Sequence, residues 1–99
     1  MSDQLETGSI LKKEIKVPNP FDFSARKHFL PQIKQDMENF ELVLDFSGVN
    51  HLDSSALGML LMAREKVGGT RARISLVNCN QKIQRILSVA QFHMLFRIS

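Results

Sequence analysis

The sequence predicts a single small α/β domain with a mixed, mainly parallel β-sheet and helices packed on it. Its 99 residues are enough for one hydrophobic core, so we expect one domain over residues 1–99. Short apolar runs alternate with segments of helical periodicity, and strands joined through helices run parallel with right-handed crossovers. Residues 1–8 are polar, which predicts a loose N-terminus in which 4–6 form a short edge strand.

The next third of the chain predicts one strand and one helix. Residues 10–17 alternate partly, which indicates a half-exposed strand whose lysines face water. The Pro-Asn-Pro triplet at 18–20 ends this strand, because proline cannot donate a hydrogen bond to a sheet ladder. Residues 21–40 are typical of a helix with Ser24 as its N-cap, and Pro31 is expected to kink that helix or restart it.

The middle of the chain predicts a buried strand followed by an apolar helix. Residues 42–46 form a nearly continuous apolar run, the pattern of a central strand covered on both faces. A polar loop at 47–53 leads into a helix that extends to Val67. Gly68 and Gly69 then supply the left-handed backbone that commonly ends a helix.

The last third predicts a strand, a helix and a final strand. Residues 72–77 form another apolar run, and the loop at 78–80 places Asn80 where it can cap the following helix. Residues 81–90 are expected to be helical and 94–98 to form the last strand. The helix has one apolar face at the spacing i, i+3, i+4, i+7, formed by Ile83, Ile86, Leu87 and Ala90.

Composition and charge exclude several classes of partner. The net charge is +3, with the lysines and arginines scattered and no Trp or Tyr, whereas nucleic-acid binders carry basic stripes interleaved with aromatics. No stretch approaches the roughly 20 apolar residues that span a bilayer, and the first residues do not resemble a secretory signal. The single Cys79 cannot form an internal disulfide and fits a reducing compartment. We therefore expect a cytoplasmic protein with no nucleic-acid or membrane partner.

The sequence does not predict an enzyme. It has no glycine-rich phosphate loop, and Cys79 has no neighbour that would activate its thiol. The proximity of His51 to Asp53 and Ser54 suggests a triad, but neighbouring residues rarely provide the required geometry. The histidines lack metal-ligand spacing: His28, His51 and His93. We expect no catalytic residue, no metal and no cofactor.

The junction Asp53-Ser54-Ser55 is the strongest functional signal in the sequence. A helix N-terminus presents unpaired N–H groups, so these residues either cap the helix or provide a serine that carries a phosphate. The helix behind them is apolar nearly all round, although a helix on a sheet buries only a stripe of its surface. Some apolar side chains are therefore expected to face a neighbouring helix or a partner. A nearby phosphate of about two negative charges would be excluded from an apolar or acidic partner surface.

The same stretch resembles a known family. Residues 49–58, VNHLDSSALG, resemble the signature loop and helix of STAS domains, the bacterial anti-sigma factor antagonists. The resemblance covers roughly residues 21–98 and implies a small mixed sheet with an antiparallel N-terminal strand pair. The segment 22–24 looks like the family's approach to its first helix. Other segments lie where the family has equivalents: 68–69, 74–77, 82–87 and 92–98.

This resemblance implies a phosphorylation-controlled binding protein that acts in transcription regulation by partner switching. In the family, the serine after the aspartate is phosphorylated by a partner serine kinase, often the anti-sigma factor itself, and a PP2C-type phosphatase reverses this. That serine matches Ser54, with Ser55 as the second choice. The unphosphorylated form binds the partner and frees a sigma factor. We expect a partner-binding surface formed by Asn50, His51, Asp53, Ser54, Ser55, Ala56, Met59 and Met62.

Two other binding functions remain open. One is a constitutive interaction subunit, such as the small STAS component of a lipid or anion transporter, which needs no phosphorylatable hydroxyl. The other is a partner-switching adaptor whose output is not a sigma factor. The two serines at 54–55 favour a phosphorylated protein over the first alternative, whereas no residue in the sequence separates the second alternative from an antagonist of an anti-sigma factor.

Overall fold

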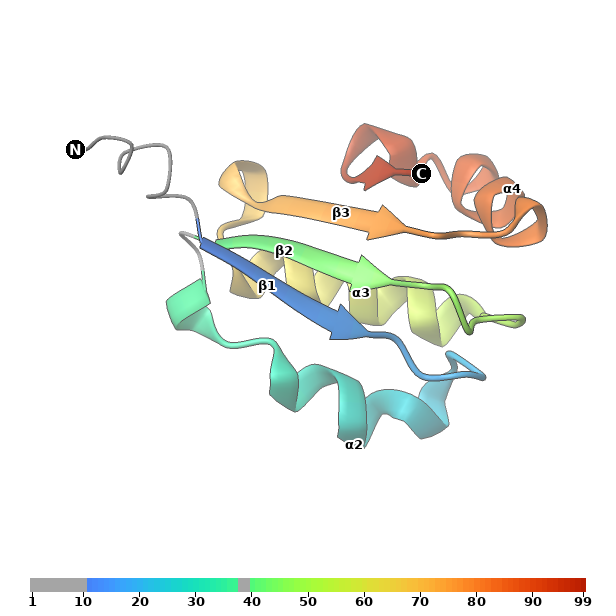
Figure 1. Ribbon diagram of the computed structural model, residues 1–99, viewed down its shortest axis with the longest axis horizontal. Coiled ribbons are helices and arrows are strands. Elements are labelled where there is room, and N and C mark those ends of the chain that lie inside the picture. Colours follow the sequence, from blue (N-terminus) through green and yellow to red (C-terminus); the bar gives the residue numbers. More distant parts are fainter. Residues whose placement is uncertain (1–10, 38–39) are drawn as a thin grey trace.

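The computed structural model describes residues 11–37 and 40–99 of the chain (Figure 1). The strands form a sheet of order β1-β2-β3-β4 in which every neighbouring pair is parallel. The predicted edge strand at 4–6, and with it the antiparallel pair, lie outside the described residues. The elements are β1 (Leu11–Lys16), α2 (Arg26–Phe29), β2 (Phe40–Asp45), α3 (Ser54–Lys66), β3 (Arg73–Val77), α4 (Gln81–Val89) and β4 (Arg97–Ile98).

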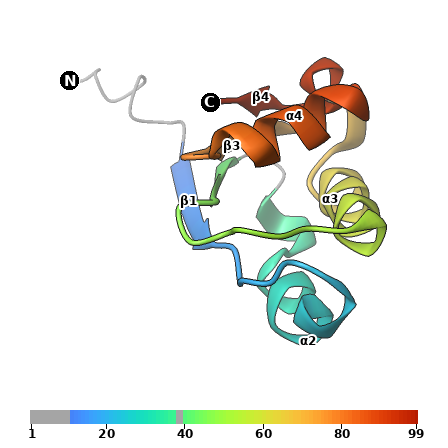
Figure 2. The same ribbon diagram turned by 90° about the vertical axis from the view of Figure 1, so that its right-hand side faces the viewer.

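The core lies on one face of this sheet. Figure 2 shows α2 and α3 on the same side of the strands, and no helix of residues 11–37 and 40–99 lies on the other side. Burial follows the alternation of a strand: in β2, Leu42 and Leu44 are fully buried, whereas Val43 and Asp45, which alternate with them, are half-buried. The expectation that this strand is covered on both faces is therefore wrong, because in the described structure the helices cover only one.

Helix α3 packs along the covered face with four buried side chains, Ala56, Met59, Leu60 and Ala63. Complete burial of a leucine such as Leu60 contributes about 2 kcal/mol of hydrophobic stabilisation. After Val67 the chain turns through Gly68 at φ +126° and Gly69 at φ +59°. Residues with a Cβ adopt these angles only with strain, so the predicted glycine termination is confirmed.

The segment 21–40 is not the single helix that its composition predicts. Only α2 is α-helical; short 3₁₀ turns precede and follow it, and Ile33 is extended. Pro31 lies in one of these turns and cannot donate a backbone hydrogen bond, which prevents a continuous helix. The first turn is capped by Asp22, whose side chain accepts from the N–H of Ser24 at 2.9 Å, so Ser24 is not the cap.

An aromatic cluster holds this irregular segment on the core. The Phe21 ring meets Phe29 edge-on, with the centroids 5.0 Å apart, and meets Phe46 at 5.8 Å. All three rings are buried. Edge-to-face pairs contribute about 1 kcal/mol beyond the area they bury, so the segment is fixed by side-chain packing rather than by helix propensity.

The C-terminal end is also less regular than predicted. Asn80 caps α4 by accepting from the N–H of Ile83 at 2.9 Å, as expected. The predicted strand at 94–98 is reduced to the two residues of β4. Gln91 has a left-handed φ of +62°, which turns the chain into a 3₁₀ turn at Phe92–Met94 and delays the return to the sheet.

Candidate functional site

The predicted site lies at the carboxyl ends of the parallel strands, where the loops that follow β1 and β2 meet. The N–H of Phe21 donates to the carbonyl of His51 at 2.9 Å, and the N–H of Asn50 donates to Oδ1 of Asn19 at 3.0 Å. This edge of an open parallel sheet is where α/β domains bind their ligands. The two loops therefore form one surface in front of the sheet.

The loop that follows β3 completes this surface. Nδ2 of Asn80 donates to the carbonyl of Val49 at 3.3 Å, so the residue that caps α4 also holds the loop between β2 and α3. The loop at 46–53 is thus tied to both of its neighbours in space. Such cross-links leave little freedom in the backbone that leads into α3.

A hydrogen-bonded carboxylate connects the strand ends beneath the loops. Asp45 accepts from Nδ2 of Asn78 at 3.0 Å and from the N–H of Ser47 at 2.9 Å. The Ser47 hydroxyl in turn accepts from Nζ of Lys16 at 3.1 Å. The hydrogen bond from Asn78, followed by those from Ser47, lowers the pKa of Asp45 below its ordinary value. Asp45 is therefore a structural anion at neutral pH.

Helix α3 begins at the surface with Asp53 as its N-cap. The Asp53 carboxylate accepts from the N–H of Ala56 at 3.0 Å, which satisfies one of the unpaired donors of the first turn. Ser54 follows as the first helical residue and is exposed, whereas Ser55 is half-buried. Ser54 is therefore the more accessible of the two serines.

The structure separates the predicted partner-binding residues into two groups. Asn50, His51 and Met62 are exposed like Ser54, and Asp53 is half-buried. By contrast, Ala56 is 0% exposed and Met59 is 4% exposed. These two residues point into the core between α3 and the sheet, so their assignment to a partner-binding surface is corrected.

Two exposed apolar residues near the site were missed by sequence reasoning. Leu61 is 41% exposed and lies seven positions after Ser54, a spacing that places both on one helix face. Phe23 is 67% exposed, and its ring lies 6.0 Å from the guanidinium carbon of Arg26. Helical spacing would have found Leu61, whereas Phe23 belongs to a segment that was predicted as an ordinary amphipathic helix.

The surface carries charge of both signs. The pKa of Asp22 is lowered, first by the hydrogen bond from the Ser24 hydroxyl and more weakly by the nearby His51.

Within residues 11–37 and 40–99, no group of three or more His, Cys, Asp or Glu side chains could hold a metal ion. In the same part of the chain, no helix is both long enough and apolar enough to cross a membrane.

This fold and this surface define a small α/β domain with a serine at the helix N-terminus beside the strand ends. The chain belongs to the STAS domain family, whose model matches residues 6–99. A STAS-domain containing protein of Pseudomonas aeruginosa (strain UCBPP-PA14) is 40% identical to it over 86 residues, which cover 86% of this chain and 85% of that protein.

Two solved structures share the fold. One is described as a candidate anti-sigma factor antagonist of Thermotoga maritima; it matches with a TM-score of 0.72 at 20% identity and covers 90% of this chain and 80% of its own. The other is the anti-sigma factor antagonist SpoIIAA in its unphosphorylated form, with a TM-score of 0.64 at 15% identity, covering 89% and 78% of the two chains. At these identities the likeness establishes the fold, which is the STAS fold predicted from the sequence.

Proposed function

We propose that this STAS domain is a non-catalytic anti-sigma factor antagonist. In its unphosphorylated form it binds an anti-sigma factor that is also a serine kinase, and phosphorylation of Ser54 ends that binding. A PP2C-type phosphatase restores the binding form, in the cytoplasm. The names of the two structures with the same fold support this proposal, and SpoIIAA is described in a form defined by the absence of phosphate.

The observation that carries the proposal is the position of Ser54 on the exposed face of α3. Residues at i, i+4, i+7 and i+8 share one face of a helix, which here places Ser54 in line with Gly58, Leu61 and Met62. Leu61 and Met62 are 41% and 46% exposed. A phosphorylatable hydroxyl thus lies on the same helix face as an apolar patch about two turns away, and this face is suited to contact another protein.

Phosphorylation would act on this patch through charge. A phosphate adds nearly two negative charges at neutral pH, and the N-terminal end of α3 accommodates them because the helix dipole is positive there. A partner that covers this helix face from Leu61 to the start of α3 would have to remove water from the phosphate. Asp53 already places a carboxylate next to Ser54, which increases the local negative charge further. Binding is therefore expected to be lost without any unfolding.

The test uses two variants of Ser54 and a matched control. The unmodified domain is used to capture its kinase partner from lysate of the source cells, and the affinity of each variant for that purified partner is then measured by calorimetry. Ser54→Ala should bind as the wild type does but accept no phosphate. Ser54→Asp should bind at least about tenfold more weakly, because it places a charge beside the apolar contact. Ser88→Asp makes the same change at an exposed serine of α4 and should bind normally.

Mass spectrometry of the protein from its native cells gives a second readout. A phosphate at Ser54 that appears and disappears with growth conditions supports the switch. A complex that forms equally with Ser54→Asp, together with no phosphate under any condition, would contradict it and favour a constitutive subunit. Phosphate at Ser55 alone would move the site by one residue to a half-buried hydroxyl.

A further inference from the structure

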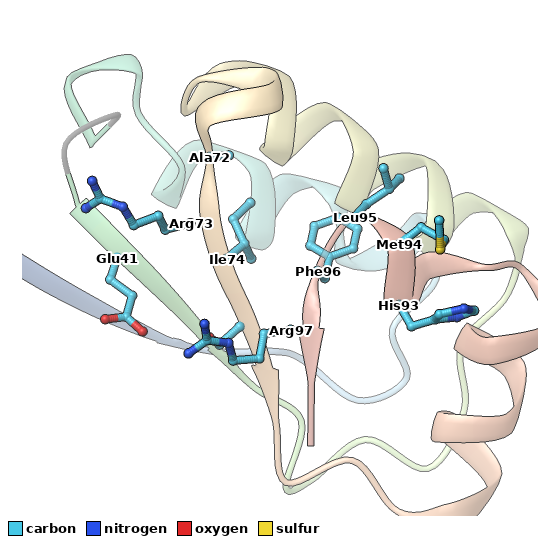
Figure 3. Close-up of a pocket in the computed structure, with 10 residues that line it drawn as sticks. Glu41, Ala72, Arg73, Ile74, His93, Met94, Leu95, Phe96 and Arg97 are labelled. Carbon is cyan, nitrogen blue, oxygen red and sulfur yellow. The ribbon is translucent and has the colours of Figure 1, made fainter.

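A second concave surface lies at the opposite end of the sheet from Ser54. It is a groove with a volume of about 500 Å³ between the start of β3 and the chain just before β4. It is lined by residues of β2, β3 and β4 and of the chain that leads into β4, among them Glu41, Arg73, Ile74, Met94, Leu95 and Arg97 (Figure 3). Nothing in the proposed switch at Ser54 uses this groove.

The groove exists because β4 is too short to cover β3. The register pairs Ser75 with Arg97 and Leu76 with Ile98, so no described strand lies opposite Ile74. The carbonyl of Leu76 accepts from the N–H of Ser99 at 2.9 Å, which shows that Leu76 directs its backbone toward β4. Alternate residues of a strand direct their backbone groups to the same side, so the N–H of Ile74 faces the groove and has no backbone partner among the described residues.

The two sides of this free edge differ in chemistry. In Figure 3 the guanidinium groups of Arg73 and Arg97 and the carboxylate of Glu41 lie on one side of β3, while Met94 and Leu95 lie on the other. Met94 is 72% exposed and Leu95 is 36% exposed. One side of the edge is therefore charged and the other apolar.

Among the described residues, the charged side has more positive than negative groups. Two guanidinium groups face one carboxylate, and the single ion pair found among the described residues is elsewhere, between Arg64 and Glu65. Ser75 also lines the groove; it is 8% exposed, and none of the hydrogen bonds of the described residues uses its hydroxyl. An incoming ligand thus meets unpaired cations, a backbone donor and a buried hydroxyl.

We propose that this groove binds an acidic peptide in extended conformation, which adds as a short strand to the free edge of β3. A carbonyl of the peptide accepts from the N–H of Ile74, the main-chain contact by which sheet edges bind peptides. Because side chains alternate along a strand, acidic residues of the peptide face Arg73 and Arg97 while apolar residues between them face Leu95. The charges of the groove select an acidic partner over a basic one.

The test titrates a short synthetic peptide of alternating glutamate and valine, capped at both ends, into the ¹⁵N-labelled domain. Amide shifts are expected to centre on Ile74, Ser75 and Arg97, and the Ile74 amide should become protected from hydrogen exchange. Arg73→Gln and Arg97→Gln should each weaken binding about three- to fivefold, because these charges are exposed to solvent. Glu41→Gln should strengthen it by a similar factor, because it removes a like charge.

Matched controls separate the groove from general attraction to a basic protein. Arg85→Gln removes an exposed arginine of α4 that does not line the groove, and should leave the affinity unchanged. A peptide with lysine in place of glutamate should not bind, and about 0.5 M salt should weaken the glutamate peptide. The proposal is overturned if millimolar peptide causes no amide shift or if the shifts centre on residues 46–54. It is also overturned if Arg73→Gln and Arg97→Gln leave the affinity for the peptide unchanged. Ser54→Asp should bind the peptide normally, so failure here is distinguishable from failure of the switch.

Discussion

At the scale of single residues, burial changes the chemistry of Cys79, the one cysteine of the chain. It is 7% exposed, and burial, with a smaller contribution from the charge of Asp45, raises the pKa of its thiol from 9.0 to about 11. The thiolate is the reactive form, and near pH 8 this shift reduces its population about a hundredfold. We expect iodoacetamide to modify the folded protein at least that much more slowly than the protein in urea, as followed by mass spectrometry. Equal rates would show that the thiol is accessible and normally acidic.

Asp45 links the strand ends to the stability of the protein in acid. Its pKa is lowered in the folded state, so the folded state binds fewer protons there than the unfolded state does. Its contribution to stability is present above the ordinary carboxyl pKa of about 3.9 and is lost as the pH falls through the lowered value. Urea unfolding at a series of pH values below about 5 should therefore show a steeper loss of stability for wild type than for Asp45→Asn. Parallel curves would mean that these hydrogen bonds do not favour the charged form.

At the level of elements, Asn80 joins a helix to the loop that carries the functional surface. Its side chain caps α4 through Ile83 and also holds the carbonyl of Val49. Asn80→Ala should lower the free energy of unfolding by about 1 kcal/mol, the usual value of an N-cap, measured by urea denaturation. Asn80→Asp keeps the acceptor for Ile83 but not the donor for Val49, so it should recover most of the cap. If Asn80→Ala left the free energy of unfolding unchanged, α4 would begin independently of its cap.

Elements whose ends carry their own signals were predictable from sequence. The helix α3 was expected between Asp53 and Val67 and is found at Ser54–Lys66, because a cap and two glycines mark its ends locally. The segment 21–40 was predicted wrongly because its apolar residues have helical spacing, while its conformation is set by Pro31 and by distant aromatic contacts. Long-range packing of this kind leaves no periodic signal in the chain.

In the candidate site, too, features marked by the local sequence were predictable, whereas features that depend on the packing of the whole molecule were not. The position of the Asp53-Ser54 junction at a helix start followed from local sequence, and the structure places it there. Helical spacing from Ser54 places Leu61 on the same face and Met59 near the opposite one, but the helix is apolar nearly all round, so Met59 was assigned to the surface and Leu61 was missed. The groove beside β3 was also beyond sequence reasoning, since it depends on the residue at which β4 begins to pair.

The hydrogen bonds that hold the loop at 46–53 have a consequence for how fast a signal can pass through this protein. Asn19, Phe21 and Asn80 fix that loop from two neighbouring segments, so the backbone before Ser54 is set before any modification occurs. If Ser54 is phosphorylated as we propose, the phosphate changes a charge on a backbone that these hydrogen bonds already hold in place. The response would then not wait for a refolding step, and its rate would be set by the modifying enzymes and by diffusion.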